Sequence, residues 1–231
     1  MDLACLDFEG ILVPEVWINV AELTGIEKLR VTTRDIPDYD ALMRQRLRIL
    51  QEHHLGLPDI QRIIAKMVPL EGAENFLGWL RERYQVILLS DTFYEFAAPL
   101  LCQLGQPVIL CHHLDIAEDG RIAGYHLRQK DSKRKAVRAF RDLNFRVIAV
   151  GDSYNDTTML AEADAGILFR PPDNVKFEFP QFRVALDYNE LRREFLGATG
   201  VPVYPSKSFP GRETYDASAR NWGDTGIELY V

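Results

Sequence analysis

The sequence lacks the features that would assign the protein to a membrane, to an oxidising compartment or to nucleic acid. Its apolar runs, such as residues 86–89 and 147–150, are far shorter than the roughly 18 residues that span a bilayer. Its three cysteines are odd in number and lack the close pairing of a zinc site, which favours free thiols in a reducing cytoplasm. No secretion signal is visible at the N-terminus. The net charge of −7 argues against a nucleic-acid partner, because phosphate backbones select clustered Lys and Arg.

Short apolar segments alternate with amphipathic helical segments along most of the chain. The strand-like segments are residues 3–6, 86–89, 108–110, 147–150 and 166–169. This alternation predicts an α/β fold with a mostly parallel sheet. Asp119 and Gly120 form a turn signal between residues 114–116 and 122–125, which predicts a hairpin appended to that sheet. A helix is expected at residues 157–163, with Asp156 as its cap.

The long segment between the first two strand-like runs has helical rather than strand-like spacing, notably at residues 39–53 and 59–67. We therefore expect a catalytic core made of residues 1–13 and 71–196, with a helical cap inserted at residues 14–70. After residue 196, Gly, Pro, Ser and Thr become frequent and the periodicity fades. Residues 197–231 are therefore predicted to form a weakly packed tail.

Acidic side chains directly follow two of the expected strands. Asp7 and Glu9 come after the first strand, and Asp152 and Asp156 come after residues 147–150. In parallel sheets the carboxyl ends of the strands share one edge, so we expect these carboxylates to meet in space. A hard cation with oxygen ligands relieves their mutual repulsion and attracts a phosphate, and Mg²⁺ suits that role.

Ser90 and Asp91 close the strand at residues 86–89 and offer a hydroxyl and backbone amides to phosphate oxygens. Lys133 adds a positive charge. Each piece alone has an ordinary explanation as a helix cap, a solvated turn or a surface lysine. Their order is harder to explain by capping, because three acidic or hydroxyl segments each follow an apolar strand directly. His112 and His113 could ligate a metal, but the sequence offers no second pair of metal ligands to match them. They are therefore interpreted as the end of a strand.

This order resembles the haloacid dehalogenase superfamily over residues 1 to about 196. Asp7 and Glu9 match its first motif, Ser90 its second, Lys133 its third and residues 151–156 its fourth. The helical insertion resembles the cap of phosphoserine phosphatases. Three segments are more closely similar to the bifunctional phosphoserine phosphatase/homoserine phosphotransferase family: residues 7–15, 90–96 and 151–160. The resemblance implies a Rossmann-like core with a small helical cap.

The resemblance also implies hydrolysis of L-phosphoserine through an aspartyl-phosphate. Asp7 would be the nucleophile, and Glu9 would act as acid and base where the wider superfamily usually has Asp. Mg²⁺ would be held by Asp7, the backbone carbonyl of Glu9 and Asp152. Asp156 would lie near the ion, either in direct contact with it or one layer of ligands further out. A hydroxyl amino acid such as homoserine would compete with water for the phosphoryl group.

Substrate contacts are implied in the same way. Ser90 and Lys133 would hold the phosphoryl oxygens, and Asn155 would orient either Lys133 or the phosphate. Asp91 stands where phosphoserine phosphatases commonly have Gly, so we expect it to use its backbone amide while its side chain points away. The remaining two contacts are with the amino-acid part of the substrate: Glu15 would bind its ammonium and Arg46 its carboxylate.

Other functions remain open at this level. A phosphatase for sugar or glycolate phosphates would share the motifs but would not need Arg46. A phospho-accepting signalling domain also uses Asp, Mg²⁺ and Lys, although its acceptor lies on a middle strand and it has no cap. A haloacid dehalogenase would need neither Mg²⁺ nor Glu9. The sequence does not fix the oligomeric state, and a homodimer is one outcome.

Overall fold

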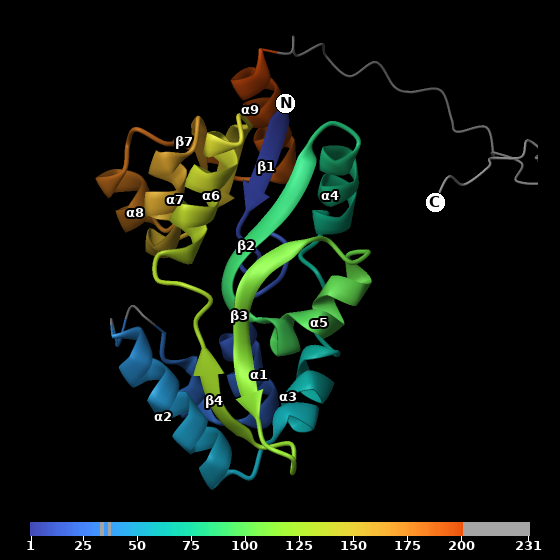
Figure 1. The fold of residues 1–231 in the computed structure, drawn as a ribbon, viewed down its shortest axis with the longest axis vertical. Coiled ribbons are helices and arrows are strands. Elements are labelled where there is room, and N and C mark those ends of the chain that lie inside the picture. The colour runs from blue at the N-terminus through green and yellow to red at the C-terminus, as the bar shows by residue number, and fades with distance from the viewer. Residues whose placement is uncertain (33–34, 37, 201–231) are drawn as a thin grey trace, which may run out of the picture.

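The structure is a computed structural model that describes residues 1–32, 35–36 and 38–200. Within these residues, strands form one sheet in the order β4-β3-β2-β1-β5-β6-β7 (Figure 1). The strands are β1 (Asp2–Leu6), β2 (Gln85–Phe93), β3 (Ile109–Ile116), β4 (Ile122–His126), β5 (Arg146–Gly151), β6 (Ala165–Phe169) and β7 (Arg183–Ala185). Only the pairing of β3 with β4 is antiparallel among them. The expected α/β fold with a mostly parallel sheet is therefore confirmed.

Between β1 and β2 the described chain forms helices, namely α1 (Val16–Thr24), the 3₁₀ turn η1 (Glu27–Arg30), α2 (Tyr39–Glu52), α3 (Leu57–Ile64) and α4 (Ala73–Arg81). Figure 1 shows α1, α2 and α3 gathered around the β3–β4 hairpin at one end of the molecule. The backbone N–H of Leu57 donates to the carbonyl of Gly120 at 2.9 Å, which joins α3 to the hairpin turn. The cap boundaries at residues 14 and 70 stay a prediction.

The remaining helices cover the two faces of the sheet. They are α5 (Tyr94–Gln103), α6 (Ser132–Asp142), the 3₁₀ turn η2 (Tyr154–Asp156), α7 (Thr157–Glu162), α8 (Asp173–Glu178) and α9 (Tyr188–Thr199). Helices α4 and α5 lie on one face, and α6 and α7 on the other (Figure 1). No described helix has both the length and the apolar character needed to cross a membrane.

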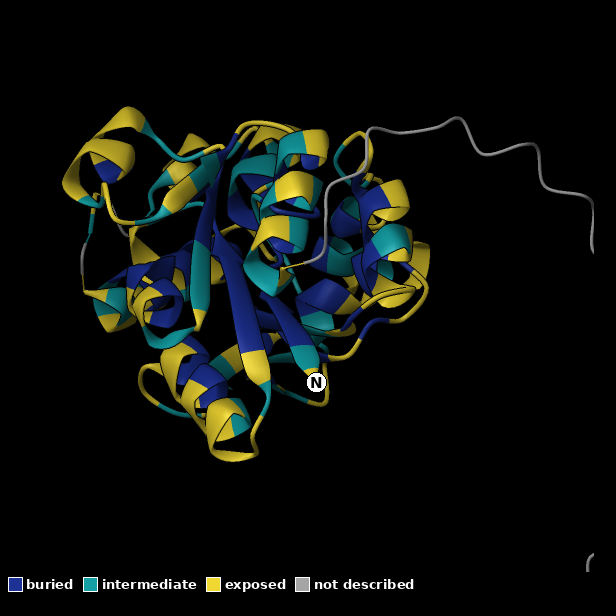
Figure 2. Ribbon diagram, turned by 90° about the horizontal axis from the view of Figure 1, so that it is seen from above, coloured by how far each residue is buried: buried dark blue, intermediate teal, exposed yellow. Residues whose placement is uncertain are grey.

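Alternate residues of β1 enter two separate cores, as the two-residue period of a strand requires. Leu3 and Cys5 pack in a cluster with residues of α6 and α7, whereas Ala4 and Leu6 belong to a larger cluster with α4, α5 and α9. Figure 2 shows the central strands as buried and the outer helix faces as exposed. The sheet is therefore covered on both faces, which holds its carboxyl edge as a rigid platform.

The hairpin prediction is confirmed in part. Residues 114–116 and 122–125 do pair across a turn, but β3 runs without a break from Ile109 to Ile116. The hairpin is therefore an extension of the sheet and not an appendage. The sequence hides this continuity because two histidines, His112 and His113, interrupt the apolar run in the middle of the strand.

Helix α9 extends past the expected end of the core at residue 196. Its Leu191 and Phe195 are fully buried, and the Phe195 ring lies 5.3 Å from Tyr84 and 6.1 Å from Phe76 between centroids. The predicted tail at residues 197–231 lies, from residue 201 onward, outside the described residues.

Replacing Phe195 with Ala is expected to lower the free energy of unfolding by about 3 to 5 kcal/mol, because it removes a buried ring and leaves a cavity. Chemical denaturation measures this change. Phe177 of α8, which is 86% exposed, is the matched control, and Phe177→Ala should change stability by less than about 0.5 kcal/mol. Equal effects of the two substitutions would contradict the packing of α9 in the core.

Candidate active site

Three neighbouring strands carry the polar residues to one edge of the sheet. Asp7 follows β1, Ser90 and Asp91 lie near the end of β2, and Asp152 follows β5. Because β1 pairs with both β2 and β5 in parallel, these three strand ends are adjacent. The backbone N–H of Asp7 still donates to the carbonyl of Val150 at 2.9 Å, so the ladder fixes the position of Asp7. The expected meeting of these segments is confirmed.

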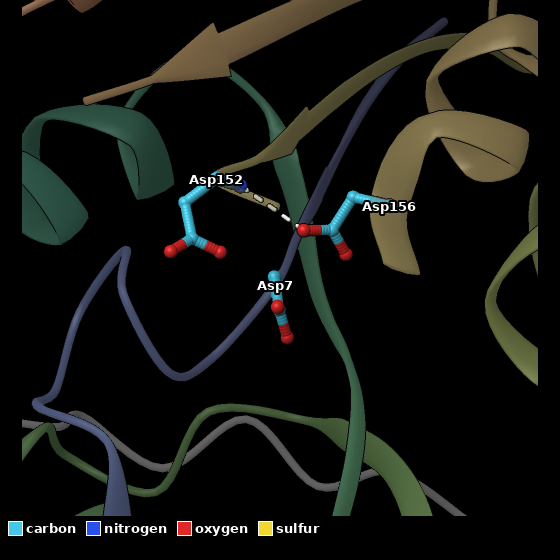
Figure 3. A group of neighbouring side chains, drawn as sticks. All are labelled: Asp7, Asp152 and Asp156. Atoms are coloured by element: carbon cyan, nitrogen blue, oxygen red, sulfur yellow. Dashed lines mark hydrogen bonds between the residues drawn. The ribbon is translucent and has the colours of Figure 1, made fainter. Parts of the chain in front are cut away.

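Three carboxylates converge at this edge. Asp7, Asp152 and Asp156 each place one oxygen within 4.8 Å of the others (Figure 3). Two glycines make the approach possible: a Cβ on Gly151 would lie 2.2 Å from the Cβ of Asp156, and one on Gly10 would lie 2.4 Å from Oδ2 of Asp152. Such a cluster of hard oxygen donors fits a divalent cation. The side chain of Glu9 is not one of these three; the expected contact of Glu9 with the metal is through its backbone carbonyl and stays a prediction.

The ammonium of Lys133 neutralises part of this buried charge. Its Nζ lies 2.9 Å from Oδ2 of Asp7, 2.8 Å from Oδ1 of Asp156 and 3.7 Å from Oδ2 of Asp91. Burial alone would lower the pKa of Lys133, but the carboxylates of Asp156, Asp7 and Asp91 outweigh it and raise the pKa. Burial and the charge of Asp156 raise the pKa of Asp7 well above its usual value, against the opposing effect of Lys133. One ammonium therefore does not balance all the carboxylates around it.

Asp156 occupies the N-cap position of α7 as expected, but its side chain makes no capping hydrogen bond to that helix. Its Oδ2 accepts a bond from the backbone N–H of Asp152 at 3.0 Å (Figure 3) and another from that of Ser153 at 3.2 Å. Its Oδ1 accepts from Lys133. The carboxylate is fully buried and points back into the loop that carries Asp152. It therefore shapes that loop, and a direct metal contact would compete with these bonds.

Glu9 sits where the core meets α1. Its Oε2 accepts a hydrogen bond from the backbone N–H of Val16 at 2.9 Å, at the start of that helix. Burial and the nearby charge of Glu15 raise the pKa of Glu9 to about 8. A carboxyl group with a pKa in this range can both release and accept a proton near neutral pH, which suits general acid–base chemistry.

A cavity of about 400 Å³ joins the sheet edge to the helical segment. The sequence-predicted site residues all contribute to its lining except Asp156, which is fully buried behind it; the lining includes Glu15 and Arg46 of the helical segment and the loop residue Asn155. Arg46 is buried, stacks over the ring of Trp17 at 4.5 Å and donates from Nη2 to the carbonyl of Val31. Its Nε is buried without a hydrogen-bond partner, and burial lowers the pKa of Arg46 to about 10.

The expectation that the Asp91 side chain points away is wrong. Its Oδ1 accepts from the Ser132 hydroxyl at 3.2 Å, and its Oδ2 faces Lys133. Burial opposes ionisation, but Lys133 and His112 outweigh burial and lower the pKa of Asp91 to about 2. Ser90 is buried beside it, with its Oγ accepting from the backbone N–H of Thr92.

Sequence reasoning missed three residues of the site. Tyr39 donates from its hydroxyl to the carbonyl of Asp91 at 3.3 Å, Trp17 underlies Arg46, and His112 faces Asp91. Tyr39 and Trp17 lie at the beginnings of α2 and α1, where an aromatic residue gives no signal beyond ordinary packing. His112 carried the one usable signal, because a His within an apolar strand needs a polar partner.

Comparisons with known proteins agree with this geometry. The family model for haloacid dehalogenase-like hydrolases matches residues 3–164. "Phosphoserine phosphatase ThrH" of Pseudomonas aeruginosa is 64% identical over 199 residues, which are 86% of this chain and 97% of that protein. "Phosphoserine phosphatase" of Pseudomonas syringae pv. tomato is 63% identical and covers 86% of this chain and 84% of its own length.

Solved structures show the same fold. A phosphoserine phosphatase in apo form has a TM-score of 0.68 at 22% identity and covers 84% of this chain and 97% of that one. A phospho-aspartyl intermediate analogue of phosphoserine phosphatase has a TM-score of 0.66 at 20% identity, with coverage of 83% and 97%. At these identities the likeness supports the fold.

Replacing Asp7 with Asn is expected to stabilise the metal-free protein by about 0.5 to 2 kcal/mol, the common size of the gain from a single stabilising substitution. The pKa of Asp7 is raised in the folded state, so its ionised form costs folding free energy at neutral pH. Denaturation in the presence of a chelator measures the change.

Asp2→Asn is the matched control for this prediction. The side chain of Asp2 bonds to Arg146, which lowers the pKa of Asp2, so its ionised form does not oppose folding. No gain in stability is expected there. If Asp7→Asn is no more stable than the native chain, the inference that Lys133 leaves an unbalanced negative charge on the carboxylates around it is wrong.

Proposed function

The chain belongs to the haloacid dehalogenase-like hydrolases, and from this membership we propose that it hydrolyses L-phosphoserine to L-serine and phosphate through an aspartyl-phosphate on Asp7. The observation that carries the proposal is the single cavity in which Asp7 and Lys133 meet the cap residues Glu15 and Arg46. The first pair suits a phosphoryl group and the second pair suits an amino acid. Relatives that are 64% and 63% identical carry the name phosphoserine phosphatase.

In the first half of the reaction a carboxylate oxygen of Asp7 attacks phosphorus, and the bond between phosphorus and the serine oxygen breaks. Glu9 gives its proton to the departing oxygen, a role that its raised pKa supports. In the second half Glu9 takes a proton from water, whose oxygen attacks phosphorus. Phosphate leaves, and the Asp7 carboxylate is restored.

The charges of the phosphoryl group are met by this chain's own donors and by a metal ion. Lys133 and the hydroxyl and backbone amides of Ser90 and Asp91 hold its oxygens, and Asn155 orients Lys133 or the phosphate. Mg²⁺, held by Asp7, Asp152 and the backbone carbonyl of Glu9, would supply further positive charge there. Asp156 supports the site by fixing Lys133 and the Asp152 loop.

Arg46 and Glu15 select the amino acid. The buried, unpartnered Nε of Arg46 gains a hydrogen bond when a substrate carboxylate arrives, and the stacking on Trp17 keeps the guanidinium in place. Glu15 offers the opposite charge to the ammonium. The same pocket can receive homoserine, whose hydroxyl would take the place of water. A homodimer and a cytoplasmic location stay predictions.

With L-phosphoserine and Mg²⁺, the native chain is expected to release phosphate, and Asp7→Asn is expected to release none because it lacks the nucleophile. Colorimetric phosphate release measures both. Added homoserine should divert part of the phosphoryl flux to phosphohomoserine, which mass spectrometry detects.

Three other outcomes would favour the alternative functions. Equal rates with sugar or glycolate phosphates would favour a phosphatase of broader specificity, and a long-lived phosphoprotein would favour a signalling domain. Activity that survives chelation of the metal would favour a dehalogenase.

Arg46→Ala is expected to reduce about 100-fold the preference, in kcat/KM, for L-phosphoserine over phosphoethanolamine, which lacks the carboxylate. This corresponds to the loss of a charged hydrogen bond of about 3 kcal/mol. Arg48→Ala, on an exposed part of the same helix, is the control and should leave the preference unchanged. If Arg46→Ala keeps the native preference for L-phosphoserine, residues other than Arg46 select the substrate carboxylate.

A further inference from the structure

His112 is a buried histidine of β3 that the reaction described above does not use. It is 3% exposed, whereas the other four histidines of the chain, His53, His54, His113 and His126, are all exposed. Its ring lies beside Phe93 at the end of β2, close to the edge of the sheet that carries Ser90 and Asp91. A polar ring buried at this position needs polar partners.

The partners of His112 fix the position of its proton. Its Nδ1 accepts a hydrogen bond from the backbone N–H of Arg128 at 3.1 Å. Because a backbone N–H can only donate, Nδ1 carries no proton, and the proton of the neutral ring lies on Nε2. Nε2 lies 3.6 Å from Oδ1 of Asp91. The N–H side of the ring is therefore the side that lies next to the Asp91 carboxylate.

Asp91 is held on several sides. The Ser132 hydroxyl donates to the same Oδ1 at 3.2 Å, and the Tyr39 hydroxyl donates to the Asp91 backbone carbonyl. The other carboxylate oxygen, Oδ2, faces the ammonium of Lys133 at 3.7 Å. An ammonium has three N–H donors, and Asp7, Asp156 and Asp91 surround that of Lys133.

We propose that His112 is a positioning residue which, together with Ser132, orients Asp91 as the third carboxylate that holds Lys133 at the phosphoryl site. The proposal rests on the proposed function, since it concerns the lysine that binds the transferring group. When Asp7 becomes esterified to phosphorus, its charge is no longer available to Lys133. Asp156 and Asp91 are then the carboxylates that remain to keep Lys133 aimed at the phosphoryl oxygens, so the orientation of Asp91 matters most in the phosphorylated enzyme.

This role predicts an effect on kcat rather than on KM. Glu15 precedes α1 and Arg46 lies in α2, whereas His112 lies in β3, so binding of the amino-acid part should be preserved. His112→Leu is expected to reduce kcat about 10-fold, which corresponds to roughly 1.4 kcal/mol of transition-state stabilisation, with KM changed less than about twofold. His112→Gln keeps an N–H near the position of Nε2 and should restore most of the rate.

A double-mutant cycle separates this role from simple packing. In an Asp91→Gly background, His112→Leu should cause no further loss of kcat, because His112 acts through Asp91. His126→Leu is the matched control: His126 pairs at 2.7 Å with Asp115 on the same hairpin, but it is exposed and its carboxylate partner does not face Lys133 in any ion pair among the described residues. Its kcat should equal that of the native chain. Thermal unfolding of each variant confirms that it is folded.

Nitrogen NMR of the histidine rings tests the proposal without any turnover. His112 should be the neutral Nε2–H form, and its Nε2 signal should move in Asp91→Gly but not in Asp115→Gly. An Nδ1–H ring, additive effects in the cycle, or a folded His112→Leu with native kcat would overturn the proposal. A native chain that is inactive on L-phosphoserine but shows the expected ring signals would overturn the proposed function alone.

Discussion

The buried ammonium of Lys133 between Asp7 and Asp156 is the interaction on which the site depends. Ionised carboxylates buried within a few ångströms of one another repel strongly, and a single Lys offsets only part of that repulsion. The protein therefore keeps a surplus of negative charge at the carboxyl edge of its sheet. That surplus opposes folding, and it also gives the site its affinity for a divalent cation and for the phosphate that the cation attracts.

The parallel sheet is what makes this arrangement possible. Asp7, Asp91 and Asp152 are far apart in the sequence but lie at the carboxyl ends of adjacent strands, so the ladders between β2, β1 and β5 fix their spacing. Gly151 lets the Asp156 carboxylate reach back to the backbone of its own loop, because any Cβ would collide with it. Lys133, near the start of α6, then lies among the carboxylates of Asp7, Asp91 and Asp156, which come from the ends of β1 and β2 and from the loop after β5.

The sequence was most informative where a functional side chain directly follows an apolar strand. Asp7, Ser90 and Asp152 could be placed together because parallel strands end at one edge. The direction of Asp91 and the role of His112 could not be predicted, because the register between β2 and β3 shifts between Leu89 and Phe93. Across such a shift, the alternation of residues along the strand no longer tells which face of the sheet a side chain occupies. The bonds of Asp156 were hidden for a related reason, since an Asp before a helix is an ordinary cap in most sequences.

The same contacts connect substrate recognition to the phosphoryl site. Helix α2 begins with Tyr39, whose hydroxyl holds the backbone of Asp91, and the same helix carries Arg46 in the cavity. Tyr125 of the hairpin bonds to Asp40, and its ring packs against Tyr39, so β4 supports the helix next to that contact. Arg46, the proposed ligand of the substrate carboxylate, therefore lies on the helix whose first turn touches the residue that faces Lys133. The two halves of the proposed site are joined by one short path through α2, and the hairpin packs against the start of that path.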